Sequence, residues 1–208
     1  FAMSYFYGHR HLLPLSHDEV VHGKATIMQK MYGDYDAKFP QARAFYMYMY
    51  AHPGKKLNFM GNEFGQLREW DEKREQDWDI LSFPVHDAFH RFMKDLNRLY
   101  QEHPAFYQKD YETDGFRWID CHQETRCIYA FERTAPKERI LAVFNFSDQE
   151  QEEYELELDE AKELTLLLAS DAQEYGGIKK YAAADFKLKN KKAVLSLTPY
   201  SAIYCQIL

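Results

Sequence analysis

The chain has 208 residues, 46% of them hydrophobic and 28% charged, so it can bury a core and is not disordered by composition. Its formal net charge of −7 argues against nucleic-acid binding through a basic face, because affinity for phosphates needs clustered Lys and Arg. The sequence has no apolar stretch long enough for a membrane span. We therefore expect neither nucleic acid nor a membrane among its partners.

Three cysteines, Cys121, Cys127 and Cys205, show no metal-ligand spacing. An odd number of such cysteines indicates free thiols in a reducing compartment, so we expect a cytoplasmic protein. The sequence holds no phosphate loop and no dinucleotide fingerprint, and we expect neither a cofactor nor a metal. The chain begins with Phe1 rather than Met, which we interpret as a segment of a longer protein.

The first hundred residues alternate between strand-like and helical patterns. Residues 12–16 form a short apolar run, and apolar residues then recur at helical spacing between Ala42 and Tyr50, with Pro40 in the expected first turn. A second apolar run covers residues 56–60, and a second amphipathic helix runs from Phe89 to Leu99. Strand, helix, strand, helix is the repeat of a parallel α/β fold.

After about residue 108 the hydrophobic period changes to two. The clearest example is residues 153–158, where glutamates alternate with Tyr154, Leu156 and Leu158. The pattern predicts strands at 127–133, 139–146, 154–158, 164–168, 193–197 and 202–207. Several short strands without helices favour an antiparallel β-sandwich. We expect the boundary between the two parts to lie between residues 101 and 111.

Ionisable residues follow the first predicted strand directly, in the segment 13–24, Leu-Pro-Leu-Ser-His-Asp-Glu-Val-Val-His-Gly-Lys. Catalytic groups of α/β barrels lie at the carboxyl ends of their strands, where a carboxylate such as Asp18 can stabilise positive charge at an anomeric carbon. The alternative is a helix start, with Ser16 as its cap and Asp18 and Glu19 facing the macrodipole. The spacing argues against a zinc site of the metalloprotease type, because His17 and His22 are five residues apart rather than four.

Polar residues also follow the second predicted strand. Asn62, Glu63 and Gln66 come after Gly61 and are suited to line a sugar site. Trp70 and Trp78 lie in the next polar loop, where each is suited either to stack on a glucose ring or to pack within the protein.

Four stretches together resemble the bacterial branching enzymes of the α-amylase superfamily. They are residues 13–24, residues 52–70, residues 95–106 and residues 114–120. The second stretch contains Gly-Asn-Glu-Phe-Gly-Gln at residues 61–66. The resemblance covers essentially the whole chain in order. It implies an α/β plus all-β fold class: residues 1–107 as the C-terminal strands and helices of a TIM-type (β/α)8 barrel, and residues 108–208 as an antiparallel β-sandwich.

The resemblance also implies roles for single residues. Asp18 matches the carboxylate that stabilises the transition state, and His17 matches the histidine that contacts the same sugar. Glu63, Gln66 and Trp70 are the further expected contacts to an α-glucan such as glycogen or amylose. The family's nucleophile and acid/base lie on earlier barrel strands, so we expect the chain to be inactive alone and the truncated barrel to favour self-association.

Two other functions remain open at this point. One is a non-catalytic carbohydrate-binding or interaction module, which a β-sandwich with exposed aromatic residues would also serve. The other is an α-glucan hydrolase of the same superfamily. A binding module has no need of a His-Asp pair after a barrel strand, whereas the products of the reaction separate hydrolysis from branching.

Overall fold

The computed structural model describes residues 12–123, 125–189 and 192–208, so Phe1 lies outside the described residues. The first half contains β1 (Leu12–Leu15), α1 (Tyr35–Ala51), β2 (Lys55–Asn58) and α2 (Pro84–Glu102). This is the predicted order of strand, helix, strand, helix. Of the helices in the described part of the chain, none combines the length and apolarity needed to cross a membrane.

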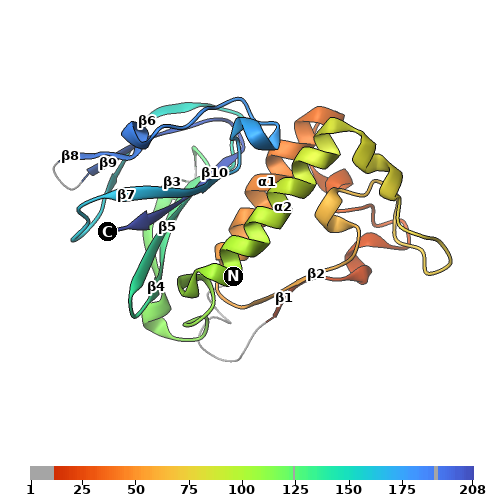
Figure 1. Cartoon of the computed structure of the whole chain (residues 1–208), viewed down its shortest axis with the longest axis horizontal. Helices are drawn as coiled ribbons and strands as arrows, with labels where there is room; N and C mark the ends of the chain where they lie inside the picture. The colour runs from red at the N-terminus through yellow and green to blue at the C-terminus, as the bar shows by residue number, and fades with distance from the viewer. Residues whose placement is uncertain (1–11, 124, 190–191) are drawn as a thin grey trace.

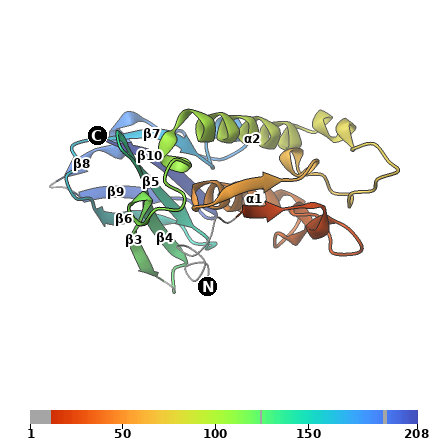
Figure 2. The same cartoon turned by 90° about the horizontal axis from the view of Figure 1, so that it is seen from below.

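Strands β1 and β2 pair in parallel, with Leu12 opposite Lys55 and Leu15 opposite Asn58. Helix α1 connects them, which makes β1, α1 and β2 one β-α-β unit. The carboxyl ends of both strands therefore lie at the same edge. Figure 1 shows that the loops following these strands gather at the end of the molecule away from the β-sandwich, and Figure 2 shows the same from below.

Helix α1 begins earlier than the sequence pattern predicted. Its N-cap is Asp34, whose carboxylate accepts a hydrogen bond from the N–H of Ala37 at 3.2 Å. The expectation that Pro40 lies in the first turn was wrong, because capping by Asp34 starts the helix at Tyr35 and leaves Pro40 inside it. The helix ends at Ala51, immediately before His52 and Pro53, as predicted. Helix α2 likewise ends at Glu102, before His103 and Pro104.

The second half is all-β and forms two antiparallel sheets that face each other. The larger sheet has the order β3-β4-β5-β10-β7 and the smaller the order β6-β9-β8. Their bounds are β3 (Phe116–Gln123), β4 (Ile128–Ala135), β5 (Glu138–Asn145), β6 (Gln151–Glu157), β7 (Leu164–Ala169), β8 (Leu188–Lys189), β9 (Lys192–Leu197) and β10 (Ser201–Ile207). The all-β part with antiparallel sheets is thus confirmed. Strands β3 and β8 were not among the predicted strands.

The larger sheet is buried on both faces. In β5, Leu141 and Val143 pack against the smaller sheet, whereas Ala142 and Phe144 pack in the core that contains α1 and α2. This explains why β5 is a continuous apolar run instead of an alternating one. Strand β6, in the smaller sheet, is buried on one face only. Its glutamates are exposed, while Tyr154 and Leu156 are buried between the sheets, as the alternation predicted.

One stripe of α1 is bonded to the β-sandwich at intervals of four residues. Arg43 donates from Nε to the carbonyl of Ser170, the hydroxyl of Tyr204 donates to the carbonyl of Met47, and Arg133 donates to the carbonyl of Ala51 at 2.6 Å. Residues four apart lie on the same face of a helix, so the sheet holds α1 along one line. The two halves therefore share one core. The boundary at residues 107 and 108 stays a prediction.

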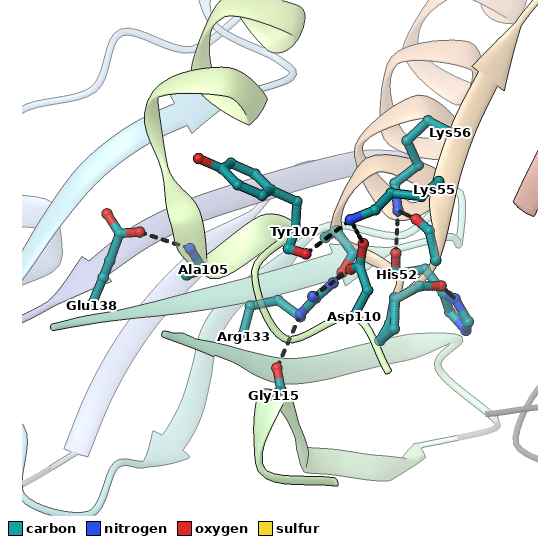
Figure 3. Close-up of polar contacts among 12 residues, drawn as sticks. His52, Lys55, Lys56, Ala105, Tyr107, Asp110, Gly115, Arg133 and Glu138 are labelled. Atoms are coloured by element: carbon teal, nitrogen blue, oxygen red, sulfur yellow. Dashed lines mark hydrogen bonds and ion pairs between the residues drawn. The ribbon is translucent and has the colours of Figure 1, made fainter. Parts of the chain in front are cut away.

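The last of these contacts belongs to a buried ion pair at the junction of the two halves (Figure 3). Arg133 on β4 donates to Asp110 at 2.8 Å and to the carbonyl of Gly115 at 3.1 Å, and both charged side chains are fully buried. Burial lowers the pKa of Arg133, and the Asp110 carboxylate opposes that shift. The other oxygen of Asp110 accepts from Lys55, the first residue of β2, at 2.7 Å. One carboxylate thus connects the β-sandwich to the start of β2.

We expect Asp110→Ala to destabilise the chain by about 3–5 kcal/mol, because it leaves the buried guanidinium of Arg133 without its counter-charge. Urea unfolding followed by circular dichroism measures this. The control is Lys192→Met, which removes the exposed pairs with Glu155 and Glu157 and should leave the stability close to that of the unchanged chain. Equal stability of the two variants would contradict the structural role of the pair.

Candidate functional site

The candidate site is built from the two loops that follow β1 and β2. The peptide N–H of Phe59 donates to the carbonyl of Leu15 at 2.9 Å, which extends the parallel pairing to the start of both loops. Further along, the N–H of Trp70 donates to the carbonyl of Val20 at 3.0 Å. The second loop therefore lies against the first at two separate points.

Directly after β1 the chain forms a single 3₁₀ turn, His17–Val20. Ser16 caps it, since its hydroxyl oxygen accepts from the N–H of Asp18 at 3.2 Å and its hydroxyl donates to Glu19 at 2.7 Å. That second bond lowers the pKa of Glu19. The segment is therefore a capped turn, and that turn lies at the carboxyl end of a parallel strand. The catalytic role of Asp18 stays a prediction.

Asp18 is the accessible carboxylate of this turn. Its side chain is 67% exposed and pairs with the ammonium of Lys24 at 2.9 Å. Lys24 also donates to the carbonyl of Asp18, again at 2.9 Å. The hydrogen bond from Lys24, followed by the charge of that ammonium, holds the pKa of Asp18 below its ordinary value. The carboxylate is thus ionised at neutral pH and open to a ligand.

His17 lies beside two aromatic rings of the second loop. Its ring centre is 5.9 Å from that of Phe59 and 6.0 Å from that of Trp70, and the rings of Phe59 and Trp70 meet edge to face at 5.3 Å. His17 itself is exposed. The structure therefore brings together three of the predicted site residues: His17, Asp18 and Trp70.

The other two predicted residues have different surroundings. Gln66 is only 5% exposed, and both ends of its amide are bonded to backbone: Oε1 accepts from Asp77 at 3.1 Å and Nε2 donates to Arg68 at 2.8 Å. Glu63 is half-buried and lies in the short 3₁₀ turn Asn62–Phe64, which packs on α2. Their role as sugar contacts stays a prediction.

Three residues of these two loops were not singled out from the sequence: Lys24, Phe59 and Glu69. Lys24 belongs to the same motif as Asp18, so its position six residues later was the available signal. Glu69 accepts hydrogen bonds from two backbone N–H groups of the first loop, and a contact over 44 and 46 residues leaves no local pattern. The second tryptophan singled out from the sequence, Trp78, is 47% exposed and packs on Phe64 at 4.7 Å between ring centres.

Within residues 12–123, 125–189 and 192–208, no group of three or more His, Cys, Asp or Glu side chains is arranged to hold a metal ion. What the site offers is an ionised carboxylate, an imidazole and an aromatic face. A fixed carboxylate stabilises a developing positive charge and accepts hydrogen bonds from hydroxyl groups. Aromatic rings present a flat apolar surface. This set is suited to a sugar.

The chain is similar to known proteins in both sequence and fold. Residues 118–207 match the family described as the C-terminal all-beta domain of alpha amylase. The chain is 42% identical over 179 residues to the 1,4-alpha-glucan branching enzyme GlgB of Oceanobacillus iheyensis, which covers 85% of this chain and 28% of that protein. It is 40% identical over 213 residues to GlgB of Aquifex aeolicus, which covers 98% of this chain and 34% of that protein.

The chain thus spans about a third or less of the length of these relatives. Among solved structures, a debranching enzyme from Nostoc punctiforme superposes with a TM-score of 0.61 at 13% identity, over 89% of this chain and 34% of that chain. At this identity the superposition supports the fold alone.

We expect Lys24→Met to raise the pKa of Asp18 toward its ordinary value, because the variant removes the hydrogen bond and the charge that lower it. A carbon-detected NMR titration of the Asp18 carboxyl measures this. Lys73→Met is the control, since Lys73 is exposed on the second loop and is not among the charges that act on Asp18. An unchanged Asp18 pKa in Lys24→Met would show that the ion pair does not form in solution.

Proposed function

We propose that this chain, a relative of the 1,4-alpha-glucan branching enzymes, forms the C-terminal part of such an enzyme. The longer protein, called the complete protein below, would cleave an α-1,4-glucan chain and transfer it to a 6-hydroxyl group, forming an α-1,6 branch in glycogen biosynthesis. It would be a retaining glycosyltransferase. The observation that carries the proposal is Asp18 at the carboxyl end of β1, within a chain at least 40% identical to branching enzymes.

In this proposal residues 1–107 are the end of a (β/α)8 barrel and residues 108–208 are its terminal β-sandwich. The parallel pairing of β1 and β2 across α1 supports it, because such units build barrels. So does the position of His17 and Asp18, since active sites of these barrels lie at the carboxyl ends of the strands.

Asp18 would grip ring hydroxyls of the glucose at the cleaved bond and stabilise positive charge at its anomeric carbon. His17 would contact the same sugar. Trp70 would either pack against the His17 ring and hold it in place or stack its own ring on the glucan. Glu63 and Gln66 would complete the substrate contacts.

Double displacement at an anomeric carbon needs a nucleophile and an acid/base roughly 5 Å apart. The resemblance assigns both to barrel strands that precede β1. Asp18 replaces neither of them, because it stabilises charge and does not attack carbon. We therefore propose that this segment contributes one of three essential carboxyl groups.

A groove beside β1 supports the idea that other strands pack there. It has a volume of about 280 Å³ and an almost wholly apolar lining that includes Leu13, Leu15, Phe45 and Met49. In the described part of the chain β1 has one strand neighbour, β2. The groove would be covered by the rest of the barrel in the complete protein and would favour self-association of the isolated chain. The thiols of Cys121 and Cys205 fit a cytoplasmic location.

The test of this function is Asp18→Asn in the complete protein. The variant keeps the shape of the side chain and removes its charge, so we expect turnover to fall on the order of 100-fold or more with the fold unchanged. Iodine staining of amylose and a count of reducing ends follow the reaction, since branching keeps that count nearly constant and hydrolysis raises it. Glu19→Gln, the neighbouring charge, is the control and should retain most activity. Near-normal branching by a folded Asp18→Asn protein would reject the role.

Assayed by itself, the 208-residue chain should show no branching activity, because stabilisation by Asp18 cannot substitute for a nucleophile and a proton donor. The same iodine assay applies, with the complete protein as the positive control. A purified chain that lowers iodine absorbance at catalytic rates would overturn the proposed division of roles.

A further inference from the structure

The first loop contains a tight turn, residues 22–25, whose backbone is unusual. His22, Gly23 and Ala25 all have positive φ angles, of 58°, 78° and 66°. Only glycine adopts this region freely, and His22 and Ala25 carry side chains that disfavour it. Such a turn persists where surrounding contacts hold it.

Glu69 supplies those contacts from the second loop. Its carboxylate accepts the N–H of Gly23 on one oxygen at 2.9 Å and the N–H of Ala25 on the other at 2.7 Å. These two bonds lower the pKa of Glu69. The neighbouring peptide N–H, of Trp70, donates to Val20 at 3.0 Å. Two adjacent residues of the second loop thus fix both ends of the segment 20–25.

Lys24 lies between the two N–H groups that Glu69 binds. Its ammonium group is the one that contacts the Asp18 carboxylate and the Asp18 carbonyl, both at 2.9 Å. The carbonyl of Ala25 is in turn held by Lys30, which also donates to the carbonyl of Glu19. A continuous chain of contacts therefore runs from Glu69 through the turn and Lys24 to Asp18.

We propose that Glu69 is a positioning residue for Asp18: by binding the backbone of residues 23 and 25 it fixes the turn that directs Lys24 at the carboxylate. Glu69 does not touch the reacting atoms in this role. The inference rests on the proposed function of Asp18 for its catalytic consequence, whereas its structural consequence can be measured without any activity.

The test uses Glu69→Gln, with Glu72→Gln as the matched control because Glu72 is exposed on the same loop. In the 208-residue chain, NMR records the amide resonances of Gly23 and Ala25 and the titration of Asp18. We expect Glu69→Gln to shift both amide resonances, speed their hydrogen exchange and raise the Asp18 pKa. The sign is diagnostic, since removing a negative charge alone would lower the Asp18 pKa, whereas loss of the Lys24 contact, the largest cause of its lowered value, raises it. Glu72→Gln should change none of these.

In the complete protein, Glu69→Gln should lower kcat about 10-fold with little change in KM, and move the acidic limb of the rate profile to higher pH. Glu69→Asp has a shorter carboxylate that reaches one N–H group at best. Its kcat should therefore lie between those of the unchanged protein and Glu69→Gln, and it replaces Glu69→Gln in the test if that variant does not fold. An Asp18 pKa that is unchanged or lowered in Glu69→Gln, or equal effects in Glu72→Gln, would overturn the proposal. Full activity of Asp18→Asn would reject the proposed function instead, and the NMR result would still decide the role of Glu69.

Discussion

The buried ion pair between Arg133 and Asp110 is the contact on which the rest of this arrangement depends. Both side chains are fully buried, so each is tolerable there only because the other is present. Through them β4 bonds the last turn of α1 at Ala51, the segment between the halves at Gly115, and the start of β2 through Lys55. The β-sandwich therefore holds the end of α1 and the start of β2 in place.

The position of Asp18 depends on that junction through β2 and β1. Strand β2 fixes β1 through four parallel pairs, and the 3₁₀ turn of His17–Val20 begins two residues after β1. The loop after β2 then returns to the loop after β1, where Trp70 bonds Val20 and Glu69 bonds Gly23 and Ala25. We infer that the terminal sandwich serves the candidate site as a rigid support, although its strands contribute none of the residues assigned to it.

Hydrophobic periodicity and helix-stop residues in the sequence predicted those elements whose form depends on neighbouring residues in the chain. The helices were predicted because each has one apolar face or a clear stop, such as His52-Pro53 after α1, and β6 because one of its faces is in water. Strand β3 was missed because its burial is irregular and its pairing with β4 is interrupted twice. The burial of Gln66 and the contacts of Glu69 depend on residues brought together by the fold. The start of α1 was misplaced for a different reason, because the local cap at Asp34 was overlooked. Of the site, the sequence provided candidate residues whose chemical role stays a prediction, and it contained no sign of what positions them.

A crystal structure of the complete protein with a bound malto-oligosaccharide tests the central claim most directly, because the claim is geometric. We predict that the Asp18 carboxylate and the His17 ring both lie within hydrogen-bonding distance of the hydroxyl groups of a single glucose, and that Glu69 still bonds the N–H groups of Gly23 and Ala25. A glucan bound across the carboxyl ends of β1 and β2 that leaves Asp18 without a sugar contact would contradict the account.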